Sequence, residues 1–510
     1  MNHLPILPVL LPSLAAILML LPPLSTRLKM QRWIAWIVLI VLVVIGAILV
    51  HNAQCQTLSY ALGGWQPPFG IVFVVDRLSA LLVAVTAVLA FCAGLYSAEK
   101  EDRAGPFYYP LFLFQVMGIN GAFLTGDLFN LFVFFEILLI ASYALLVHGG
   151  GSENTKAGFH YVTVNLIGSA LFLIALGTLY GTLGSLNMAD MAYRVVYLPP
   201  EDQILAKTGG LLLLLVFSLK SALLPLHFWL PQTYAAASAS VVALFAVMTK
   251  VGFYSICRVF AGVFGNDAGA LANLAIPWIW PLAIATIAIG SFGLLAATSL
   301  RLMTVNVVIV SVGTLLLAFV IGGGQSLSIG FYYLLHSTII TGALFLIADL
   351  IGSQRGAAMD RFVQARPVSQ ATFLGGVFLV AAIAAIGLPP LSGFVGKALF
   401  LQSTSRFAEQ AWVWPALLIS SLMALVAFSR AGSTLFWHVS AQESSESQNA
   451  RPTQIVAISI LLSTTVLMTV FADSIVTYSQ DAAREIRKSS TTLPHHINID
   501  SSHVRKTDES

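Results

Sequence analysis

Four ionisable side chains lie in the middle of otherwise apolar segments, where they could carry protons. They are Glu136 in LFVFFEILLIASY, Lys220 in VFSLKSALLP, Lys250 in LFAVMTKVGFYS and Lys397 in SGFVGKALF. A charged side chain at the centre of a bilayer costs roughly 2.5–3.5 kcal/mol on an insertion scale, so the four together cost about 10–14 kcal/mol. We therefore expect these groups to face one another, water or a polar relay. The alternative is that they form purely structural ion pairs.

The balance of charge among these four residues predicts a mechanism. Three lysines accompany one glutamate, so an interior with every group ionised would hold a surplus of positive charge. Burial disfavours the charged form of a lysine, whereas a neighbouring carboxylate favours it. A lysine that gains and loses Glu136 as a partner would hold and then release a proton, as a proton relay requires.

Three further side chains are candidates: His336 as a member of the relay, and His227 and Asp127 as accessory residues. His336, in YYLLHSTIITG, lies within an apolar segment, and histidine titrates near neutral pH, which suits a relay; a structural, hydrogen-bonded histidine is the alternative. His227 follows Pro225 by two residues, where broken backbone needs partners, so a structural role and a proton-transfer role are both open. Asp127 lies nine residues before Glu136, about 900° of helical rotation away and so on the opposite face. We interpret Asp127 as a helix cap or a gate residue.

Charged residues near the ends of apolar segments receive a simpler interpretation. Asp76 and Arg77 are expected to form an interfacial pair at the start of a span. Asp349 and Arg430 are expected to be solvated, and none of these residues is assigned to the relay.

The candidates must be positioned by membrane-spanning helices. Apolar residues make up 58% of the 510 and charged residues only 9%, with a mean hydropathy of +0.87, whereas a soluble domain carries about 25% charged residues. The sequence predicts an all-α polytopic membrane protein of about fourteen transmembrane helices. The expected spans are 4–24, 33–51, 75–97, 107–125, 127–148, 160–183, 209–230, 233–260, 273–298, 302–322, 327–350, 371–402, 411–437 and 454–476. Residues from Ser479 onward are expected to form a weakly ordered polar tail.

The remaining composition argues against several classes of function. A net charge of +3 without a basic stripe gives no indication of nucleic-acid binding. Cys55, Cys92 and Cys257 are far apart and have no CxxC motif or histidine cluster beside them, so no disulfide, zinc or iron–sulfur site is predicted. No P-loop and no GxGxxG motif after a strand pattern is present. We expect no bound cofactor and no metal.

Two spans are predicted to be broken in the middle. One reads LVFSLKSALLPLHFWLP and the other AIGLPPLSGFVGKALF, and each carries prolines a few residues from a lysine. Proline removes a helix hydrogen bond, and bare backbone in lipid is costly, so such breaks lie inside the protein or beside water. A pair of interrupted segments, one in each half of the chain, indicates an inverted-repeat transporter; simple proline kinks are the alternative.

The distribution of lysine and arginine predicts the orientation. With the N-terminus outside, eleven of these residues fall in short cytoplasmic loops, against four outside (Arg194, Lys207, Arg258 and Arg406). The positive-inside rule therefore favours an outer N-terminus, and an even number of spans places the tail outside too.

Five ordered motifs resemble a known family. LFNLFVFFEILLIASY, LKSALLPLHFWLP, MTKVGFYSICRV, YYLLHSTIITGALF and GLPPLSGFVGKALFL are similar to motifs of the antiporter-like subunits, a family shared by respiratory complex I, membrane-bound hydrogenases and Mrp-type multisubunit sodium/proton antiporters. The resemblance covers about residues 60–440, and the greatest similarity is to the D subunits of the Mrp type.

The resemblance implies a fold of fourteen helices with two inverted five-helix repeats, each containing a broken helix. The implied units are helices 1–3 (1–106), the first repeat (107–260), the second repeat (261–437), the last helix (438–478) and the polar tail (479–510). It also implies family positions for the relay: Glu136 on helix 5, Lys220 on helix 7, Lys250 on helix 8, His336 on helix 11 and Lys397 on helix 12.

This chain departs from its relatives at several positions. Lys397 stands where the most similar complex I member usually has glutamate, and Thr341 stands where some relatives have a second helix-11 lysine. The sequence 235–240 reads AAASAS, where relatives often have Ala-Pro, so its backbone is an open question. We expect no counterpart of the long lateral helix that ends the longest complex I member.

These observations predict a proton-translocating subunit of a multisubunit monovalent cation/proton antiporter in the bacterial cell membrane, a transporter component and not an enzyme. Its expected partners are other subunits of the complex and the lipid bilayer. A proton-pumping subunit of a redox complex and a structural scaffold are the alternatives. Sodium prefers oxygen ligands and is repelled by lysines, so the cation is expected to pass through another subunit or an interface.

Overall fold

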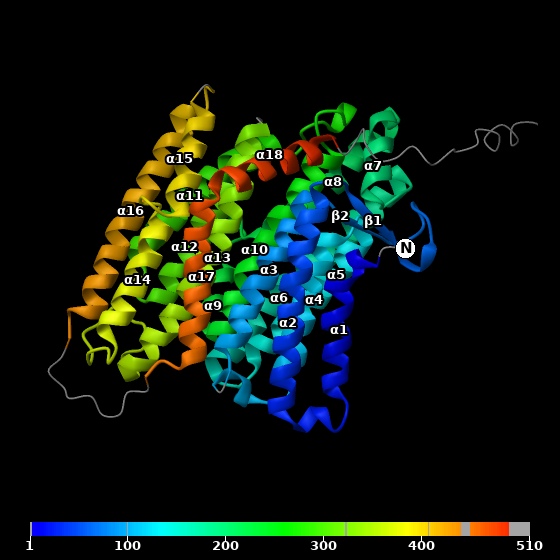
Figure 1. The fold of residues 1–510 in the computed structure, drawn as a ribbon. Coiled ribbons are helices and arrows are strands. Elements are labelled where there is room, and N and C mark those ends of the chain that lie inside the picture. The colour runs from blue at the N-terminus through cyan, green and yellow to red at the C-terminus, as the bar shows by residue number, and fades with distance from the viewer. Residues whose placement is uncertain (1–2, 99, 322–323, 406, 440–448, 489–510) are drawn as a thin grey trace, which may run out of the picture.

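The computed structural model describes residues 3–98, 100–321, 324–405, 407–439 and 449–488, and these form a bundle of helices (Figure 1). The helices are α1 (Leu7–Leu20), α2 (Leu28–Ala53), α3 (Arg77–Tyr96), α4 (Tyr108–Leu124), α5 (Leu128–Val147), α6 (Ser152–Leu183), α7 (Met188–Arg194), α8 (Pro200–Ser221), α9 (Trp229–Ala236), α10 (Ala239–Cys257), α11 (Ile276–Ala296), α12 (Leu300–Val320), α13 (Gly324–Arg355), α14 (Ala371–Ile386), α15 (Ser392–Thr404), α16 (Gln410–Phe436), α17 (Pro452–Val470) and α18 (Ala472–Lys488). A π-helix, Arg258–Val263, continues α10.

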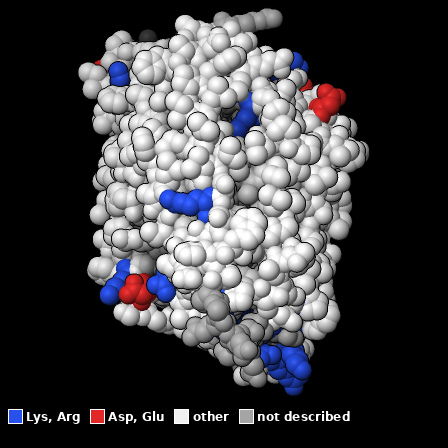
Figure 2. All heavy atoms as spheres, turned by 90° about the vertical axis from the view of Figure 1, so that its left-hand side faces the viewer, with Lys and Arg blue, Asp and Glu red and all other residues white. Residues whose placement is uncertain are grey.

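The bundle is a membrane protein by the length and composition of its helices. Within the described residues, 11 helices are long and apolar enough to cross a bilayer, and two shorter apolar helices accompany them. Large apolar side chains such as Ile140, Phe159 and Leu166 point outward and are exposed, as expected for a lipid-facing surface. Figure 2 shows one lateral face that is mostly uncharged between its two ends, apart from isolated basic side chains. The prediction of a helical polytopic membrane protein is confirmed.

Both predicted helix interruptions are present. α8 ends at Ser221 and α9 begins at Trp229, while α14 ends at Ile386 and α15 begins at Ser392. Each first half ends in a residue with left-handed backbone, Ala222 (φ 62°) and Gly387 (φ 83°), which turns the chain out of the helix.

Side chains stabilise the first interruption by satisfying backbone groups that the broken helix leaves free. The indole of Trp229 donates to the Leu219 carbonyl (2.9 Å), and the Leu224 amide donates to the Thr286 hydroxyl (3.0 Å). The break is therefore a built feature with its own partners, beyond what a proline kink alone would need.

α10 is the most enclosed helix of the bundle. The most apolar window of its span is wholly buried by other parts of the chain. It approaches the first interruption very closely, because a Cβ atom on Gly252 would lie 2.5 Å from the Ser221 backbone nitrogen. Only glycine permits this contact, which brings the centre of α10 against the end of α8.

Two elements lie at one end of the bundle, called here the hairpin end. β1 (Leu58–Ala61) and β2 (Val72–Val75) form an antiparallel hairpin in which Leu58 pairs with Val75. This short hairpin is an addition to the predicted helical bundle and leaves its fold class unchanged. The opposite end, called the basic end, carries Lys100, Arg301 and Arg361.

α18 also lies at the hairpin end and crosses the bundle sideways (Figure 1). Its Ala482, Ala483 and Ile486 are buried, and Glu485 forms an ion pair with Arg77 of α3 (3.4 Å) and accepts a hydrogen bond from Thr57. The prediction of a weakly ordered tail from Ser479 is wrong for residues 479–488, because the helix buries an apolar stripe. Residues 489–510 lie outside the described part.

Candidate proton-relay site

Glu136 and Lys220 are joined through helix α6. The Ser169 hydroxyl donates to the Glu136 carboxylate, and the Lys220 ammonium donates to the Asn165 amide oxygen (2.9 Å). Asn165 and Ser169 are four residues apart, so they lie on one face of α6. The sequence predicts that Glu136 partners a lysine directly. In the structure, Ser169 and Asn165 lie between the Glu136 carboxylate and the Lys220 ammonium.

Other contacts fix the geometry at Lys220. The Asn165 amide nitrogen donates to the Tyr161 carbonyl (2.9 Å), which leaves its oxygen free to face the lysine. The Lys220 ammonium also lies 5.8 Å from the centre of the Phe135 ring, within cation–π range. Phe135 and Glu136 are neighbours on α5, so α5, α6 and the end of α8 form one polar site.

Lys250 is fully buried at the centre of the bundle. Its ammonium donates to the Ser311 hydroxyl of α12 (2.7 Å), and that hydroxyl in turn donates to the Val308 carbonyl (2.7 Å). The serine is thereby oriented with a lone pair toward the lysine. Ser311 holds Lys250 without any opposite charge.

His336 and Lys397 form a second grouping around the other interruption. His336 Nδ1 lies 2.8 Å from the Ser392 hydroxyl at the start of α15. The Lys397 ammonium donates to the Ile386 carbonyl (2.7 Å) at the end of α14 and to the Ser421 hydroxyl of α16 (2.8 Å). The carbonyl freed by the break thus becomes a ligand for the buried lysine.

Gly393 allows this second grouping to close. A Cβ atom on Gly393 would lie 2.1 Å from the Ala384 carbonyl oxygen and 2.9 Å from His336 Nε2. Both contacts are far too short for any other residue, so the two half-helices and the histidine meet only because residue 393 is glycine.

Neutral oxygens, and not carboxylates, hold the three lysines. Among the ion pairs formed by the described residues, none includes Lys220, Lys250 or Lys397. Hydrogen bonds to a charged group stabilise it by about 1.5–3 kcal/mol, less than a buried opposite charge would. The free energies of the protonated and the neutral lysine are therefore closer to each other than they would be beside a buried carboxylate.

The accessory candidates have different surroundings. The Asp127 carboxylate accepts a hydrogen bond from the Asn130 amide (2.8 Å) and caps α5, which confirms the cap interpretation, and burial raises the pKa of Asp127. His227 Nδ1 is buried in the first interruption and has no partner among the described atoms. The Thr341 hydroxyl donates to the Ser337 carbonyl (2.6 Å) within its own helix, so it contributes nothing to His336.

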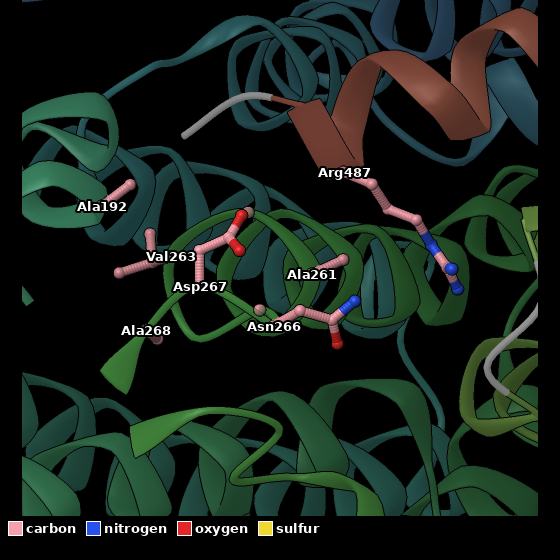
Figure 3. A pocket seen from close by; sticks show the side chains of 9 residues that line it. Ala192, Ala261, Val263, Asn266, Asp267, Ala268 and Arg487 are labelled. Carbon is pink, nitrogen blue, oxygen red and sulfur yellow. The ribbon is translucent and has the colours of Figure 1, made fainter. Parts of the chain in front are cut away.

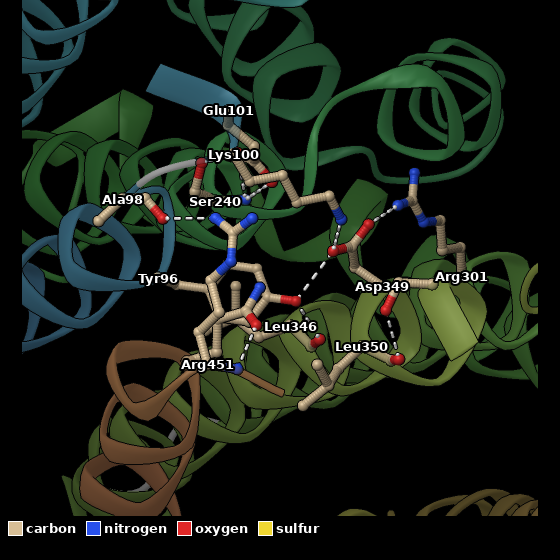
Figure 4. Close-up of polar contacts among 12 residues, drawn as sticks. Tyr96, Ala98, Lys100, Glu101, Ser240, Arg301, Leu346, Asp349, Leu350 and Arg451 are labelled. Carbon is tan, nitrogen blue, oxygen red and sulfur yellow. Dashed lines mark hydrogen bonds and ion pairs between the residues drawn. The ribbon is translucent and has the colours of Figure 1, made fainter. Parts of the chain in front are cut away.

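Two interpretations of charged residues at helix ends are wrong. Asp76 pairs with Arg258 (2.5 Å), the first residue of the π-helix, whereas Arg77 pairs with Glu485 of α18 (3.4 Å). Asp349 is not solvated: its carboxylate pairs with Lys100 (2.5 Å) and Arg301 (2.9 Å) (Figure 4).

Arg430 lies within α16, where its side chain is exposed and reaches the Ala297 carbonyl (3.2 Å).

The polar partners on α6, α12, α15 and α16 were not found from the sequence. They are Asn165, Ser169, Ser311, Ser392 and Ser421. The spacing of Asn165 and Ser169 within the apolar run of α6 was the one available signal, since two polar residues four apart mark one helix face. Single serines in the other helices carry no comparable pattern.

Metal binding has no candidate site near these residues. In the part of the chain that the structure describes, no three His, Cys, Asp or Glu side chains come together to hold a metal ion. A small cavity between the Val263–Ala268 loop and Arg487 of α18 contains Asp267 but none of the relay candidates (Figure 3). This cavity lies at the hairpin end and does not mark the relay.

The fold and the site define a class of protein: a polytopic helical membrane protein with two broken helices and buried lysines held by neutral oxygens, an arrangement suited to ion translocation. Comparison with known proteins identifies the family. The family model described as NADH:quinone oxidoreductase/Mrp antiporter, TM matches residues 125–426, which is more than half of the chain. The chain belongs to this family.

Individual relatives extend the match over most of the chain. It is 40% identical over 473 residues to the D subunit of the probable K(+)/H(+) antiporter of Rhizobium meliloti (strain 1021), covering 86% of this chain and 87% of that protein. It is 40% identical over 450 residues to the D subunit of the Na(+)/H(+) antiporter of Bacillus subtilis (strain 168), with the same coverage of both chains. A chain of the Mrp complex from Dietzia sp. DQ12-45-1b superposes with a TM-score of 0.81 at 24% identity, covering 96% of this chain and 98% of that one.

Proposed function

We propose that this chain is the D subunit of an Mrp-type antiporter complex, which exchanges a monovalent cation for protons across a bacterial cell membrane. The observation that carries the proposal is the 40% identity to two antiporter D subunits over 86% of the chain. One of these relatives is described as part of a K(+)/H(+) antiporter and the other as part of a Na(+)/H(+) antiporter, so the cation exchanged is sodium or potassium.

The buried lysines form the proton path in this proposal. A proton passes between Lys220, Lys250 and Lys397, and Glu136 and His336 adjust the protonation of these lysines. The bridging groups are Asn165, Ser169, Ser311, Ser392 and Ser421. Support comes from the contacts: each lysine lies on a hydroxyl, amide or carbonyl oxygen, and serine hydroxyls both accept and donate protons. His227, at the first break, is an accessory member.

Fourteen membrane crossings and two inverted repeats complete the proposal. To the 11 long apolar helices we add α1, α4 and the pair α14–α15. The repeats cover 107–260 and 261–437, preceded by helices 1–3 (1–106) and followed by the last crossing helix, α17, and by α18 at the hairpin end. The matching interruptions, each ending in left-handed backbone and each beside a lysine, support the repeat.

The basic end faces the cytoplasm in this proposal, with the N-terminus outside. The excess of lysine and arginine in the loops of that end supports the orientation. Arg258, however, is half-buried and paired with Asp76, so it does not count as a loop charge at the outer end. Reporter fusions placed after α18 should be active outside; activity confined to the cytoplasm would contradict the orientation.

The cation passes mainly through partner subunits. Sodium and potassium need several oxygen ligands and are repelled by ammonium groups, whereas the deep positions of this chain hold three lysines and one glutamate. The other subunits of the complex, or an interface with them, therefore supply the cation path, and this chain supplies protons.

The test is a flux measurement on the native complex. The complex is purified, its visible spectrum is checked for flavin and iron–sulfur absorbance, and it is reconstituted in vesicles where proton and cation fluxes are followed separately. We expect coupled fluxes that are lost in Lys250→Ala although the complex still assembles. Redox absorbance with quinone-driven pumping would favour the alternative, a member of a redox complex; normal fluxes in Lys250→Ala would contradict the relay.

A further inference from the structure

A chain of proton-active side chains leads from the surface of the basic end into the bundle, apart from the relay residues. It begins at Glu101 in a short helix, Glu101–Ala104, between α3 and α4. The Glu101 carboxylate accepts hydrogen bonds from the Ser240 amide (3.2 Å) and from the Ser240 hydroxyl. Ser240 lies at the start of α10, the helix that carries Lys250 ten residues further on.

The hydrogen bonds continue inward from Ser240. Its hydroxyl lies 2.6 Å from the Tyr108 hydroxyl at the start of α4, and both side chains are fully buried. Carboxylate, serine hydroxyl and tyrosine hydroxyl thus form an unbroken series. Glu101 itself is half-buried, so the series connects solvent with the interior.

Beyond Tyr108 lies a buried amide that lacks a protein partner. Gln115 is seven residues further along α4, two turns on, so it shares the face of Tyr108. Its side chain is fully buried, and neither amide atom has a partner among the described atoms. Buried polar groups are almost always hydrogen-bonded, and they bind water where the protein offers no partner. Gln115 therefore indicates a buried water molecule next to the face of α4 that carries Tyr108.

The charges around Glu101 keep it responsive to pH. Lys100 of the same loop, Asp349 of α13, Arg301 of α12 and Tyr96 of α3 lie around it (Figure 4). Ser238 also donates a hydrogen bond to Glu101, and the ring of His148, at the end of α5, lies 5.9 Å from the ring of Tyr108. Burial and the nearby Asp349 raise the pKa of Glu101, despite the hydrogen bonds from Ser240 that lower it.

We propose that Glu101, Ser240 and Tyr108 are the site at which this subunit exchanges protons with the water at its basic end, and that they deliver them toward Lys250. Protons move by hops in which each group gives one and receives one. The Glu101 carboxylate takes a proton from water and passes it to the Ser240 hydroxyl, which gives its own proton to Tyr108. Tyr108 gives its own proton to water near Gln115, and that water protonates neutral Lys250, so no net charge stays on either hydroxyl or on the water. The reverse series releases a proton from Lys250 to the water at the basic end.

The proposal rests on the proposed function, because it supplies protons to the same relay. Two adjacent tyrosines offer a matched test. Tyr108 and Tyr109 are both fully buried at the start of α4, but the Tyr109 hydroxyl donates to Asp102 (3.1 Å) and takes no part in the series. Each Tyr→Phe change removes one hydroxyl and keeps the ring.

The experiment measures cation-driven proton movement in everted vesicles, across external pH 6 to 9, normalised to assembled complex. Tyr108→Phe should slow proton movement about a hundredfold, the lower end of what a proton-transfer group contributes, whereas Tyr109→Phe should match wild type. Glu101→Gln should slow proton movement and remove the pH dependence that Glu101 sets at the basic end. Glu101→Asp should recover part of the rate and part of the pH dependence.

The outcomes separate this inference from the proposed function. If Tyr108→Phe and Glu101→Gln both match wild type while Lys250→Ala is inactive, protons use another path and the inference is wrong. If Tyr108→Phe and Tyr109→Phe are equally slow, or Glu101→Gln is slow with an unchanged pH profile, the role is structural and the inference is also wrong. Normal activity in Lys250→Ala would contradict the proposed function itself.

Discussion

Asn165 provides the sharpest test of how the buried lysines are held. Its amide oxygen is the hydrogen-bond acceptor of Lys220, and its amide nitrogen is anchored on the Tyr161 carbonyl. Asn165→Leu keeps the branched shape of the side chain but removes the acceptor. The protonated lysine then loses a hydrogen bond worth about 1.5–3 kcal/mol for a charged group.

This loss converts into a rate. Each 1.4 kcal/mol is about a tenfold change in an equilibrium, so protonated Lys220 should become roughly 10- to 100-fold rarer at a given pH. Antiport that passes through protonated Lys220 should fall by a similar factor. Asn165→Asp should also impair antiport, for the opposite reason, because a carboxylate beside the ammonium holds the proton too tightly.

The assay is cation-induced proton movement in everted vesicles, with complex assembly followed on native gels. Asn120→Leu is the matched control: Asn120 is a fully buried asparagine that donates to the Pro8 carbonyl and forms no hydrogen bond to a lysine among the described residues. We expect Asn120→Leu to alter assembly or stability at most. Wild-type antiport per assembled complex in Asn165→Leu would refute the argument that a neutral acceptor controls Lys220.

Three further predictions follow from the same contacts. Glu136→Gln should reduce antiport more than Glu136→Asp, because Gln keeps the shape but loses the charge; vesicle assays across pH 6 to 9 test this, and a Gln variant equal to wild type would show that the charge is not needed. Lys397→Ala should abolish most antiport while the complex assembles normally. Ser421→Ala should reduce antiport, whereas Ser420→Ala should not, because the Ser420 hydroxyl donates to the Leu417 carbonyl and not to Lys397. Equal effects of the two serine changes would argue against a lysine-specific role. Ser240→Ala removes the hydroxyl that donates to Glu101 and lowers its pKa, which burial already raises. The pH at which Glu101 loses its proton, and with it the midpoint of the pH profile, should therefore rise; a shift to lower pH would contradict the sign.

Much of the fold could be predicted from the sequence because lipid imposes a simple rule. Long apolar runs must become helices, and prolines beside a lysine must mark breaks that other residues repair. α18 escaped this rule: residues 472–488 are amphipathic and too polar for a span, so only packing against the bundle shows that they are helical. The hairpin was missed because its strands are four residues each.

The charged positions of the site could be predicted, but their partners could not. Glu136, Lys220, Lys250 and Lys397 stand out because charge is rare and costly in an apolar helix. Asn165 and Ser311 do not stand out, since serine and asparagine occur in membrane helices for many reasons. Asp349 was misjudged because its partners, Lys100 and Arg301, lie far away in the sequence and meet it only in the folded chain.

Lys250 on α10 and Glu136 on α5 differ in what surrounds them, and this difference decides whether the isolated chain or the intact complex is the right preparation for studying each residue. Lys250 is enclosed entirely by its own chain, so detergent extraction of the single protein leaves its surroundings as they are in the native assembly. Glu136 is partly exposed on the lateral surface of α5, so whatever molecule touches that surface, lipid, detergent or a neighbouring protein, sets part of its environment. Spectroscopy on the isolated chain therefore reports faithfully on Lys250, whereas titration of Glu136 has meaning only in the intact complex embedded in lipid.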